Sequence, residues 1–222
     1  MLKAESLRVI YGEHVALDDA SLSVGSGEIV AVVGRSGSGK STLLHCLAGI
    51  TRPSAGRITL GDMRVDTATD DELSELRRSR FGFVFQFGEL VPELSLLENV
   101  SLPLRFAGVS RREARRRSEA VLVELGIGEL AGRLPGQVSG GQAQRAAVAR
   151  ALVHSPSVVF ADEPTGALDT HSGETVLAAL GSLARNRGAS VVLVTHDSRV
   201  ADLADRVVQV IDGRVVSPEA AR

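Results

Sequence analysis

Apolar runs recur along this chain, and their patterning predicts where its strands lie. Residues 29–33, 157–161 and 189–194 are nearly uninterrupted runs of apolar side chains, the pattern typical of buried parallel strands. Residues 2–9 and 16–24 alternate between apolar and polar positions, which also predicts strands. Shorter strands are predicted at residues 57–60, 81–85, 206–211 and 214–216, the last two as a hairpin around Asp212 and Gly213.

Helices are predicted in the intervals between these strands. Their expected bounds are residues 41–49, 70–78, 95–100, 110–125, 143–153 and 172–187. Ser110 and Glu113 are spaced to form a capping box, and Thr170 or Ser172 is expected to cap the last helix. Strands interspersed with helices predict an α/β fold.

Composition narrows the class of protein. The chain of 222 residues is long enough for one large domain, and its 44% hydrophobic content supports a packed core. The formal net charge of −2 argues against binding nucleic acid by bulk charge. No apolar run approaches the roughly 20 residues of a membrane span, and residues 1–6 lack a signal-peptide core. We therefore expect a cytoplasmic protein without direct membrane insertion, and we expect Cys46, the single cysteine, to be a buried filler.

A glycine-rich loop carries the first functional signal. Residues 34–41 read Gly-Arg-Ser-Gly-Ser-Gly-Lys-Ser and fit the pattern G-x-x-x-x-G-K-[ST] at every fixed position, between a predicted strand and a predicted helix. Glycines let the backbone N–H groups turn inward toward phosphate oxygens, and the helix directs its partial positive end to the same place. Lys40 can reach the β- and γ-phosphates, and Ser41 can place its hydroxyl on Mg²⁺. The loop predicts a binding site for a nucleoside triphosphate.

Polar residues at three predicted strand ends suggest the rest of that site. Asp162 and Glu163 end one buried strand, where α/β sheets bind ligands. Asp162 suits Mg²⁺, and Glu163 can orient or deprotonate an attacking water. His196 ends another strand and can donate a hydrogen bond to phosphate, while Gln86 can contact a metal or its water.

Two further positions have both a structural and a functional interpretation. Tyr11, the only tyrosine, is either a turn aromatic or a platform on which adenine stacks. Ser139 stands where a helix N-cap belongs, and the glycines at 140 and 141 leave nearby backbone N–H groups accessible. This stretch is therefore a second possible anion site.

The predicted helix at 110–125 is rich in arginine. Its basic residues are Arg111, Arg112, Arg115, Arg116 and Arg117. They form either a patch for nucleic acid or lipid head groups or a solvated face interleaved with Glu113 and Glu119. The interleaved acids favour the solvated face.

Together these motifs resemble the nucleotide-binding subunit of ATP-binding cassette (ABC) transporters over almost the whole chain. Ser139-Gly140-Gly141-Gln142 is the most specific part, because many phosphate-loop proteins share only the loop. The resemblance implies an α/β P-loop NTPase (RecA-like) core with an N-terminal antiparallel β subdomain and an inserted helical subdomain. It implies a single domain, residues 1–222, with the core and β subdomain in 1–86 and 154–222 and the helical subdomain in 87–153.

The resemblance also implies a role for each site residue. Tyr11 would stack on adenine, and Ser41, Gln86 and Asp162 would hold Mg²⁺. Glu163 would be the catalytic carboxylate, assisted by His196 and Gln86. The residues implied in ATP binding are Gly34, Arg35, Ser36, Gly37, Ser38, Gly39, Lys40, Ser41 and Thr42.

A second copy of the chain is implied as a partner. By the resemblance, Ser139, Gly140, Gly141, Gln142 and Asp169 act in trans on the ATP that the other copy's phosphate loop holds. Two copies would then enclose two ATP molecules head to tail and separate after hydrolysis.

A finer similarity concerns the subfamily. Residues 83–86, 90–100, 102–104 and 161–166 are similar to the macrolide-efflux and lipoprotein-release subfamily. This implies an ATPase that powers a separate membrane permease in export or extrusion, peripheral at the inner face of the cell membrane. The alternative is a cassette of the cell-division type, which signals through a membrane partner without transport.

Two other classes are disfavoured by the residues. A soluble cassette acting on DNA or ribosomes usually carries two cassettes or a long coiled-coil insertion, and this chain has a single phosphate loop and no heptad run. A scaffold that binds nucleotide without hydrolysis is disfavoured because Lys40, Gln86, Glu163 and His196 are all present.

Overall fold

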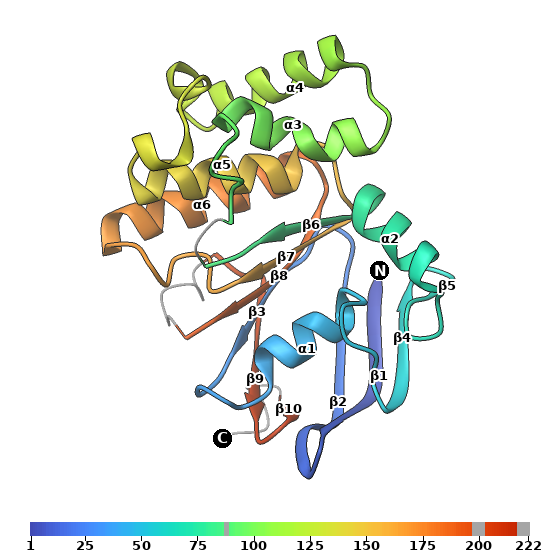
Figure 1. Ribbon diagram of the computed structural model, residues 1–222. Coiled ribbons are helices and arrows are strands. Elements are labelled where there is room, and N and C mark those ends of the chain that lie inside the picture. Colours follow the sequence, from blue (N-terminus) through green and yellow to red (C-terminus); the bar gives the residue numbers. More distant parts are fainter. Residues whose placement is uncertain (87–88, 197–202, 217–222) are drawn as a thin grey trace. The chain divides into compact units, whose positions relative to one another are not determined.

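The computed structural model describes residues 1–86, 89–196 and 203–216 (Figure 1). The chain forms two compact units. The first comprises Met1–Glu75 and the segment from Ser190 onward, and the second comprises Leu76–Ala189.

The first unit contains two groups of strands. β1 (Leu2–Tyr11), β2 (His14–Val24), β4 (Ala55–Leu60) and β5 (Met63–Arg64) form an antiparallel sheet in the order β2-β1-β4-β5. In the other group, β3 (Ile29–Val33) lies between β8 (Ser190–Thr195) and β9 (Arg206–Ile211), parallel to both. β10 (Arg214–Val216) pairs antiparallel with β9, and α1 (Lys40–Leu47) follows β3.

The second unit is mainly helical. β6 (Phe81–Val84) and β7 (Val158–Asp162) pair in parallel. The helices are α3 (Leu96–Phe106), α4 (Arg111–Glu124), α5 (Gly140–Leu152) and α6 (Thr170–Asn186), with short 3₁₀ turns at Gly128–Leu130 and Pro135–Gln137. α5 packs against α3, α4 and α6, and Figure 1 shows it running alongside α6. The predicted α/β fold, with an antiparallel sheet at the N-terminus, is confirmed.

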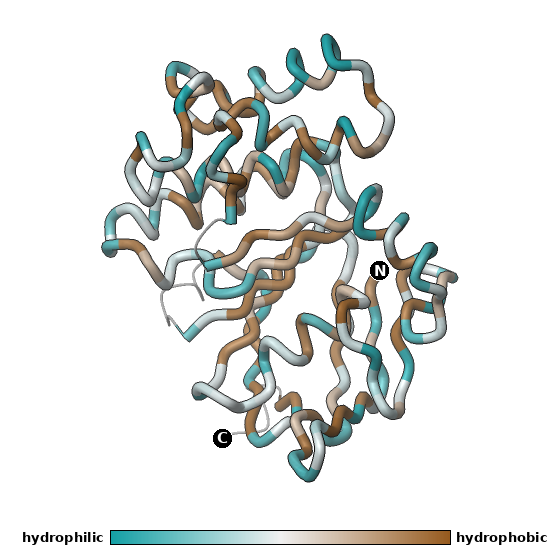
Figure 2. Tube along the Cα trace, in the orientation of Figure 1, coloured by the Kyte–Doolittle hydropathy of each residue, from teal (hydrophilic) through white to brown (hydrophobic). Residues whose placement is uncertain are grey.

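The uninterrupted apolar runs form the buried strands, as predicted. Val30, Ala31 and Val32 in β3 are fully buried, and every residue of β8 is buried. Because both faces of these strands are covered, they need apolar side chains at consecutive positions rather than at alternate ones. Figure 2 shows these strands as mostly hydrophobic, whereas α4 carries long hydrophilic stretches.

Cys46 is fully buried within α1, and burial raises the pKa of its thiol to about 12. A thiol with such a pKa carries almost no thiolate near neutral pH, so it does not act as a nucleophile. The prediction that Cys46 fills the core is confirmed.

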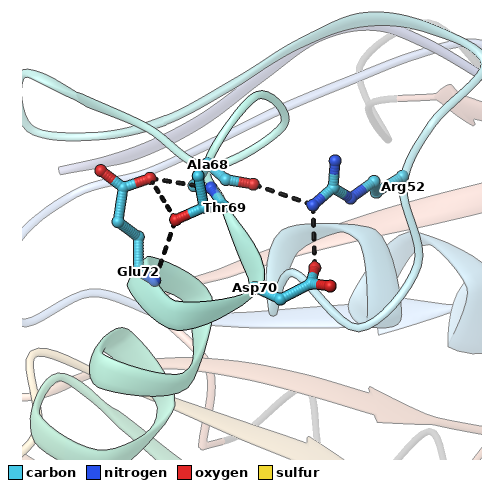
Figure 3. A network of polar contacts seen from close by, with 5 residues as sticks. All are labelled: Arg52, Ala68, Thr69, Asp70 and Glu72. Carbon is cyan, nitrogen blue, oxygen red and sulfur yellow. Dashed lines mark hydrogen bonds and ion pairs between the residues drawn. The ribbon is translucent and has the colours of Figure 1, made fainter.

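The first turn of α2 (Asp70–Ser79) is closed by a capping box that the sequence analysis did not identify (Figure 3). The Glu72 carboxylate accepts from the backbone N–H of Thr69, and the Glu72 N–H donates to the Thr69 hydroxyl oxygen. Arg52, from the loop after α1, donates to the carbonyl of Ala68 and to the carboxylate of Asp70. These bonds tie the loop after α1 to the start of α2.

Two predicted caps need correction. Ser110 accepts from the Glu113 N–H, but the Glu113 carboxylate accepts from Arg116 and Arg117 instead of completing a capping box. Ion pairing at one turn's distance outcompetes the return bond to the Ser110 backbone. The helix α6 is capped by Asp169, neither by Thr170 nor by Ser172, because α6 begins two residues earlier than the apolar pattern indicated.

Three of the five arginines of α4 form ion pairs with acids of the same helix. Arg116 and Arg117 contact Glu113, and Arg115 contacts Glu119. The paired guanidinium groups lower the pKa of Glu113 to about 2. These exposed pairs agree with the solvated face favoured by the sequence.

Within the described ranges, none of the helices combines the length and apolar character that crossing a membrane would require.

The partly buried side chain of His154 makes the stability of the fold depend on pH. His154 Nε2 donates to the Phe81 carbonyl at 3.0 Å, while its buried Nδ1 has no hydrogen-bond partner in the part of the chain that the structure describes. Burial lowers the pKa of His154, with a smaller opposing effect from the Phe81 bond. The unfolded chain therefore binds this proton more readily than the folded chain, and stability falls as pH drops below the unfolded pKa of about 6.5.

We predict that the urea midpoint falls between pH 7 and pH 5, and that His154→Gln flattens this dependence. The Gln amide keeps a donor for the Phe81 carbonyl but does not titrate. His14→Gln is the matched control, because His14 is exposed on β2. An unchanged pH profile in His154→Gln, measured beside the wild type by urea titration, would contradict the assignment.

Candidate nucleotide-binding site

The phosphate loop closes around its own lysine. Residues 34–39 join β3 to α1, and Lys40, the first residue of α1, is only 8% exposed. Its Nζ donates to the carbonyls of Gly34 and Arg35, each at 2.9 Å. The ammonium charge is thus held at the centre of the loop, where it can exchange a carbonyl for a phosphate oxygen.

Two of the loop glycines are required by close approach. A Cβ on Gly34 would lie 2.4 Å from the Val210 carbonyl oxygen, and one on Gly39 would lie 2.5 Å from that of Ala16. Gly39 also has a φ of 105°, which disfavours any residue with a side chain. The loop therefore depends on glycine to pass between β2 and β9.

The loop contains a buried polar atom and borders a cavity. Ser38 is 9% exposed, and its hydroxyl oxygen has no hydrogen-bond partner among the described residues. An open cavity of about 410 Å³ lies beside it, lined by residues 35–38 of the loop and 209–212 of the β9–β10 hairpin. A buried hydroxyl without a partner, a lysine and an N-terminal helix end are groups that fit a bound anion. The donors present therefore suit a triphosphate.

The hairpin of β9 and β10 is hydrogen-bonded to the phosphate loop. Its turn residues, Asp212 and Gly213, have φ values of 47° and 77°, as the two central residues of a type I′ turn require. The Gly213 N–H donates to the Ser38 carbonyl at 2.9 Å, and the Gly213 carbonyl accepts from the backbone N–H of Asp18 in β2 at 3.0 Å. The hairpin itself is predicted from the sequence, but its hydrogen bond to the phosphate loop is not.

His196 lies at the same sheet edge as the phosphate loop. In the parallel pair β3–β8, Val33 lies opposite Thr195, so Gly34 and His196 leave the sheet from neighbouring strand ends. His196 is exposed. The structure therefore brings this histidine to the edge that carries the phosphate loop, as expected for strand ends in an α/β sheet.

Tyr11 ends β1 at the hairpin that leads to β2, where it pairs with His14. Its side chain is 52% exposed, so the aromatic face is accessible, as a stacking platform for a base requires.

The second unit brings Gln86 and the acid pair together. In the parallel pair β6–β7, Val84 lies opposite Ala161, which places Gln86 and Glu163 two residues beyond the same register position. Glu163 has a φ of 46°, and its carbonyl accepts from the N–H of Gly166 across a tight turn. A Cβ on Gly166 would lie 2.7 Å from the Gln86 amide nitrogen, so the Gln86 side chain lies directly on this turn.

The left-handed φ of Glu163 is a backbone conformation that non-glycine residues adopt only when their surroundings hold it, at a cost of about 1–3 kcal/mol. Asp162, the last residue of β7, is half-buried, as is Glu163. The end of β7 and the turn after it therefore carry two consecutive carboxylates, those of Asp162 and Glu163.

The start of α5 lies beside the start of α6. Ser139 caps α5 in a capping box with Gln142, as the sequence placed it. A Cβ on Gly141 would lie 3.3 Å from the hydroxyl of Ser172, and the Asp169 carboxylate accepts from that hydroxyl at 2.7 Å. This bond and the Ser172 N–H lower the pKa of Asp169. Two helix N-termini therefore meet near an exposed serine and an exposed aspartate.

The predicted site residues thus form three groups within the described residues. The phosphate loop and His196 share a sheet edge in the first unit. In the second unit, Gln86 lies with Asp162 and Glu163, and Ser139–Gln142 lie with Asp169.

Comparison with known proteins identifies the family. A family model described as "ABC transporter" matches residues 17–166. The chain belongs to the ABC transporter family. The family and enzyme class predicted from the sequence are therefore confirmed, and the chain is an ATP-binding cassette ATPase.

Curated relatives are macrolide export proteins. The chain is 44% identical over 226 residues to the macrolide export ATP-binding/permease protein MacB 1 of Yersinia pestis, covering 100% of this chain and 35% of the relative. It is 48% identical over 202 residues to MacB of Burkholderia pseudomallei, covering 91% of this chain and 31% of the relative. The chain therefore spans about a third of the length of the curated relatives it matches.

Solved structures agree with the fold. The ATP-binding cassette MJ0796 in a dimeric post-hydrolysis state bound to ADP and Pi is 39% identical and superposes with a TM-score of 0.88, covering 97% of this chain and 96% of that one. A second dimeric structure of MJ0796, a bacterial ABC transporter cassette, is 40% identical with the same TM-score and coverage.

We predict that Lys40→Ala abolishes tight ATP binding, because it removes the ammonium from the centre of the loop. Isothermal titration with ATP measures the effect, and the loss is expected to be at least about 100-fold in Kd, which corresponds to two charge-assisted hydrogen bonds. Lys3→Ala is the matched control, since Lys3 is the only other lysine and makes an exposed pair with Glu5. Near-normal ATP affinity in Lys40→Ala would refute the loop assignment.

Proposed function

We propose that this chain is the ATP-hydrolysing motor of an exporter, that two copies close around two ATP molecules, and that it drives a membrane permease. The observation that carries the proposal is that one chain has both a preformed phosphate loop and an exposed, capped helix N-terminus at Ser139. The first holds a triphosphate, and the second offers N–H groups that remain accessible to another copy.

The residues that hold the nucleotide follow from the loop. Backbone N–H groups of residues 34–42 and the Lys40 ammonium bind the phosphates, and the exposed Tyr11 ring stacks on the base. Mg²⁺ is proposed to take oxygen ligands from Ser41, Gln86 and Asp162, a donor set of the kind this hard cation prefers. When bound, the cation neutralises charge that develops on the transferred phosphoryl group.

The remaining roles fall to side chains next to these ligands. Glu163 accepts a proton from, or orients, the water that attacks the γ-phosphate, and its half-buried position favours that role over free solvation. His196 donates a hydrogen bond to the γ-phosphate, and Gln86 positions water at the metal. Residues 87–88, which follow Gln86 and open the proposed helical subdomain, lie outside the described residues.

The trans contribution is proposed for the group at the start of α5. Ser139, Gly140, Gly141 and Gln142 would meet the ATP held by the other copy, with Asp169 beside them. The dimeric solved relatives support this assignment. We also propose that residues 87–153 act as the helical subdomain of one cassette, with 1–86 and 154–222 as its nucleotide-binding core and β subdomain.

The relatives support export as the driven process. The matched relatives are named as macrolide export proteins with an ATP-binding part and a permease part, and this chain spans about a third of their length. This similarity favours transport over the signalling function of the cell-division type. The cassette would then work at the cytoplasmic face of the membrane, held there by the permease.

The test uses Glu163→Gln, which keeps the side-chain volume but removes the carboxylate. We predict that this variant binds Mg-ATP without hydrolysing it and elutes as a dimer in size-exclusion chromatography with Mg-ATP, and as a monomer without nucleotide. The trapped dimer is expected because a γ-phosphate that is not cleaved continues to bridge the two copies. Glu129→Gln, the same change at an exposed glutamate, is the matched control and should hydrolyse ATP normally.

An absence of dimer with ATP demonstrably bound to Glu163→Gln would overturn the proposal that two copies close on the nucleotide. Full hydrolysis by Glu163→Gln would overturn the role of this carboxylate.

A further inference from the structure

The helix α5 holds two other segments of the second unit by their backbone carbonyls. Gln144 Nε2 donates to the Phe85 carbonyl at 2.7 Å, and Arg150 Nη1 donates to the Glu89 carbonyl at 2.7 Å. Arg145 Nη1 donates to the Leu125 carbonyl, at the end of α4, at 3.1 Å. Two of these three bonds reach the short stretch of chain that contains Gln86.

The bond from Gln144 is buried and close to Gln86. Gln144 is 2% exposed, one of few polar side chains buried to this extent in the described residues. A buried amide is retained only with hydrogen-bond partners, because an unpaired one costs about 1–3 kcal/mol. The acceptor, Phe85, is the residue immediately before Gln86, so this bond fixes the backbone from which the Gln86 side chain extends.

The position of that backbone decides where the Gln86 amide lies. The side chain packs on Gly166, whose N–H donates to the carbonyl of Glu163. A displacement of the Phe85 carbonyl therefore changes the position of Gln86 on the turn that carries the acid pair. On the other side of Gln86, Glu89 has a φ of 43°, a backbone conformation that the Arg150 bond helps to hold.

The same helix displays the group proposed to act in trans. α5 begins at its N-cap Ser139, and Gln144 lies in its second turn. Because Ser139, Gln144 and Arg150 belong to one continuous helix and its cap, a rigid-body shift of α5 would move all three together. Nothing in the local sequence of Gln86 makes this connection.

We propose that Gln144 and Arg150 are positioning residues for ATP hydrolysis, which hold the backbone on both sides of Gln86 and couple its position to the helix that begins at Ser139. This inference rests on the proposed role of Gln86. A purely structural role for the two side chains would lower stability without acting through Gln86.

A double-mutant cycle on kcat separates these roles. Gln144→Met keeps the length and volume of the side chain but removes the donor to Phe85. We expect kcat for ATP hydrolysis by the purified chain to fall about tenfold, with the Kd for ATP unchanged because the phosphate loop is intact. In the background of Gln86→Ala, the same change should cause no further loss, since its effect passes through the residue already removed.

Arg150→Met is the second variant and should behave in the same way, and it keeps the test valid if Gln144→Met does not fold. Arg145→Met is the matched control. It removes the same kind of bond from the same helix, but to Leu125, so it should show no coupling to Gln86.

The outcomes separate the two proposals. Normal hydrolysis by Gln86→Ala would refute the proposed role of Gln86, and this inference with it. Impaired hydrolysis by Gln86→Ala, with losses from Gln144→Met and Arg150→Met that simply add to it, would refute the positioning role alone. An equal coupling of Arg145→Met to Gln86 would also overturn it, because any loosening of α5 would then suffice.

Discussion

A buried ammonium group held by two backbone carbonyls is the interaction on which the site depends. Lys40 is nearly excluded from water, and burying a charge is tolerated only when hydrogen bonds replace the lost solvation. The carbonyls of Gly34 and Arg35 provide those bonds, and they do so only because the loop curls back toward its own helix. A phosphate oxygen that replaces a carbonyl partner exchanges a dipole for a charge, so binding an anion is favoured.

The shape of this loop is maintained by residues from distant parts of the chain. β2 approaches Gly39 so closely that a side chain there would collide with the Ala16 carbonyl, and the β9–β10 turn donates to Ser38. In the second unit, α5 has the equivalent organising role. Its N-terminus is capped by Ser139, its polar side chains hold the backbone near Gln86, and its start packs beside the Asp169 cap of α6. Preorganised donors of this kind need no rearrangement when charge develops during the reaction.

The sequence predicted features whose cause is local. The buried strands, the β9–β10 hairpin and the cap at Ser139 follow from patterns within a few residues, and the phosphate loop has fixed spacing. Asp169 was missed as a cap because Asp, Thr and Ser compete within four residues, and the packing of Gly141 on Ser172 is not visible locally. Glu113 was misassigned for a similar reason, since two arginines a turn away compete for its carboxylate.

Features that depend on tertiary contacts could not be predicted from the sequence. The support of Ser38 by Gly213 and the tether from Gln144 to Phe85 join segments far apart in the chain. The left-handed backbone at Glu163 is another case, because glutamate has no intrinsic preference for it and the surrounding turn imposes it.

The central claim is that the phosphate loop, more than the base contact, binds the nucleotide. Isothermal titration of the wild-type chain with ATP and with AMP tests it most directly, because the two ligands share the base and ribose and differ in the β- and γ-phosphates. The account predicts that ATP binds at least about 100-fold more tightly than AMP, as two charge-assisted hydrogen bonds would give. Equal affinities for ATP and AMP would contradict it.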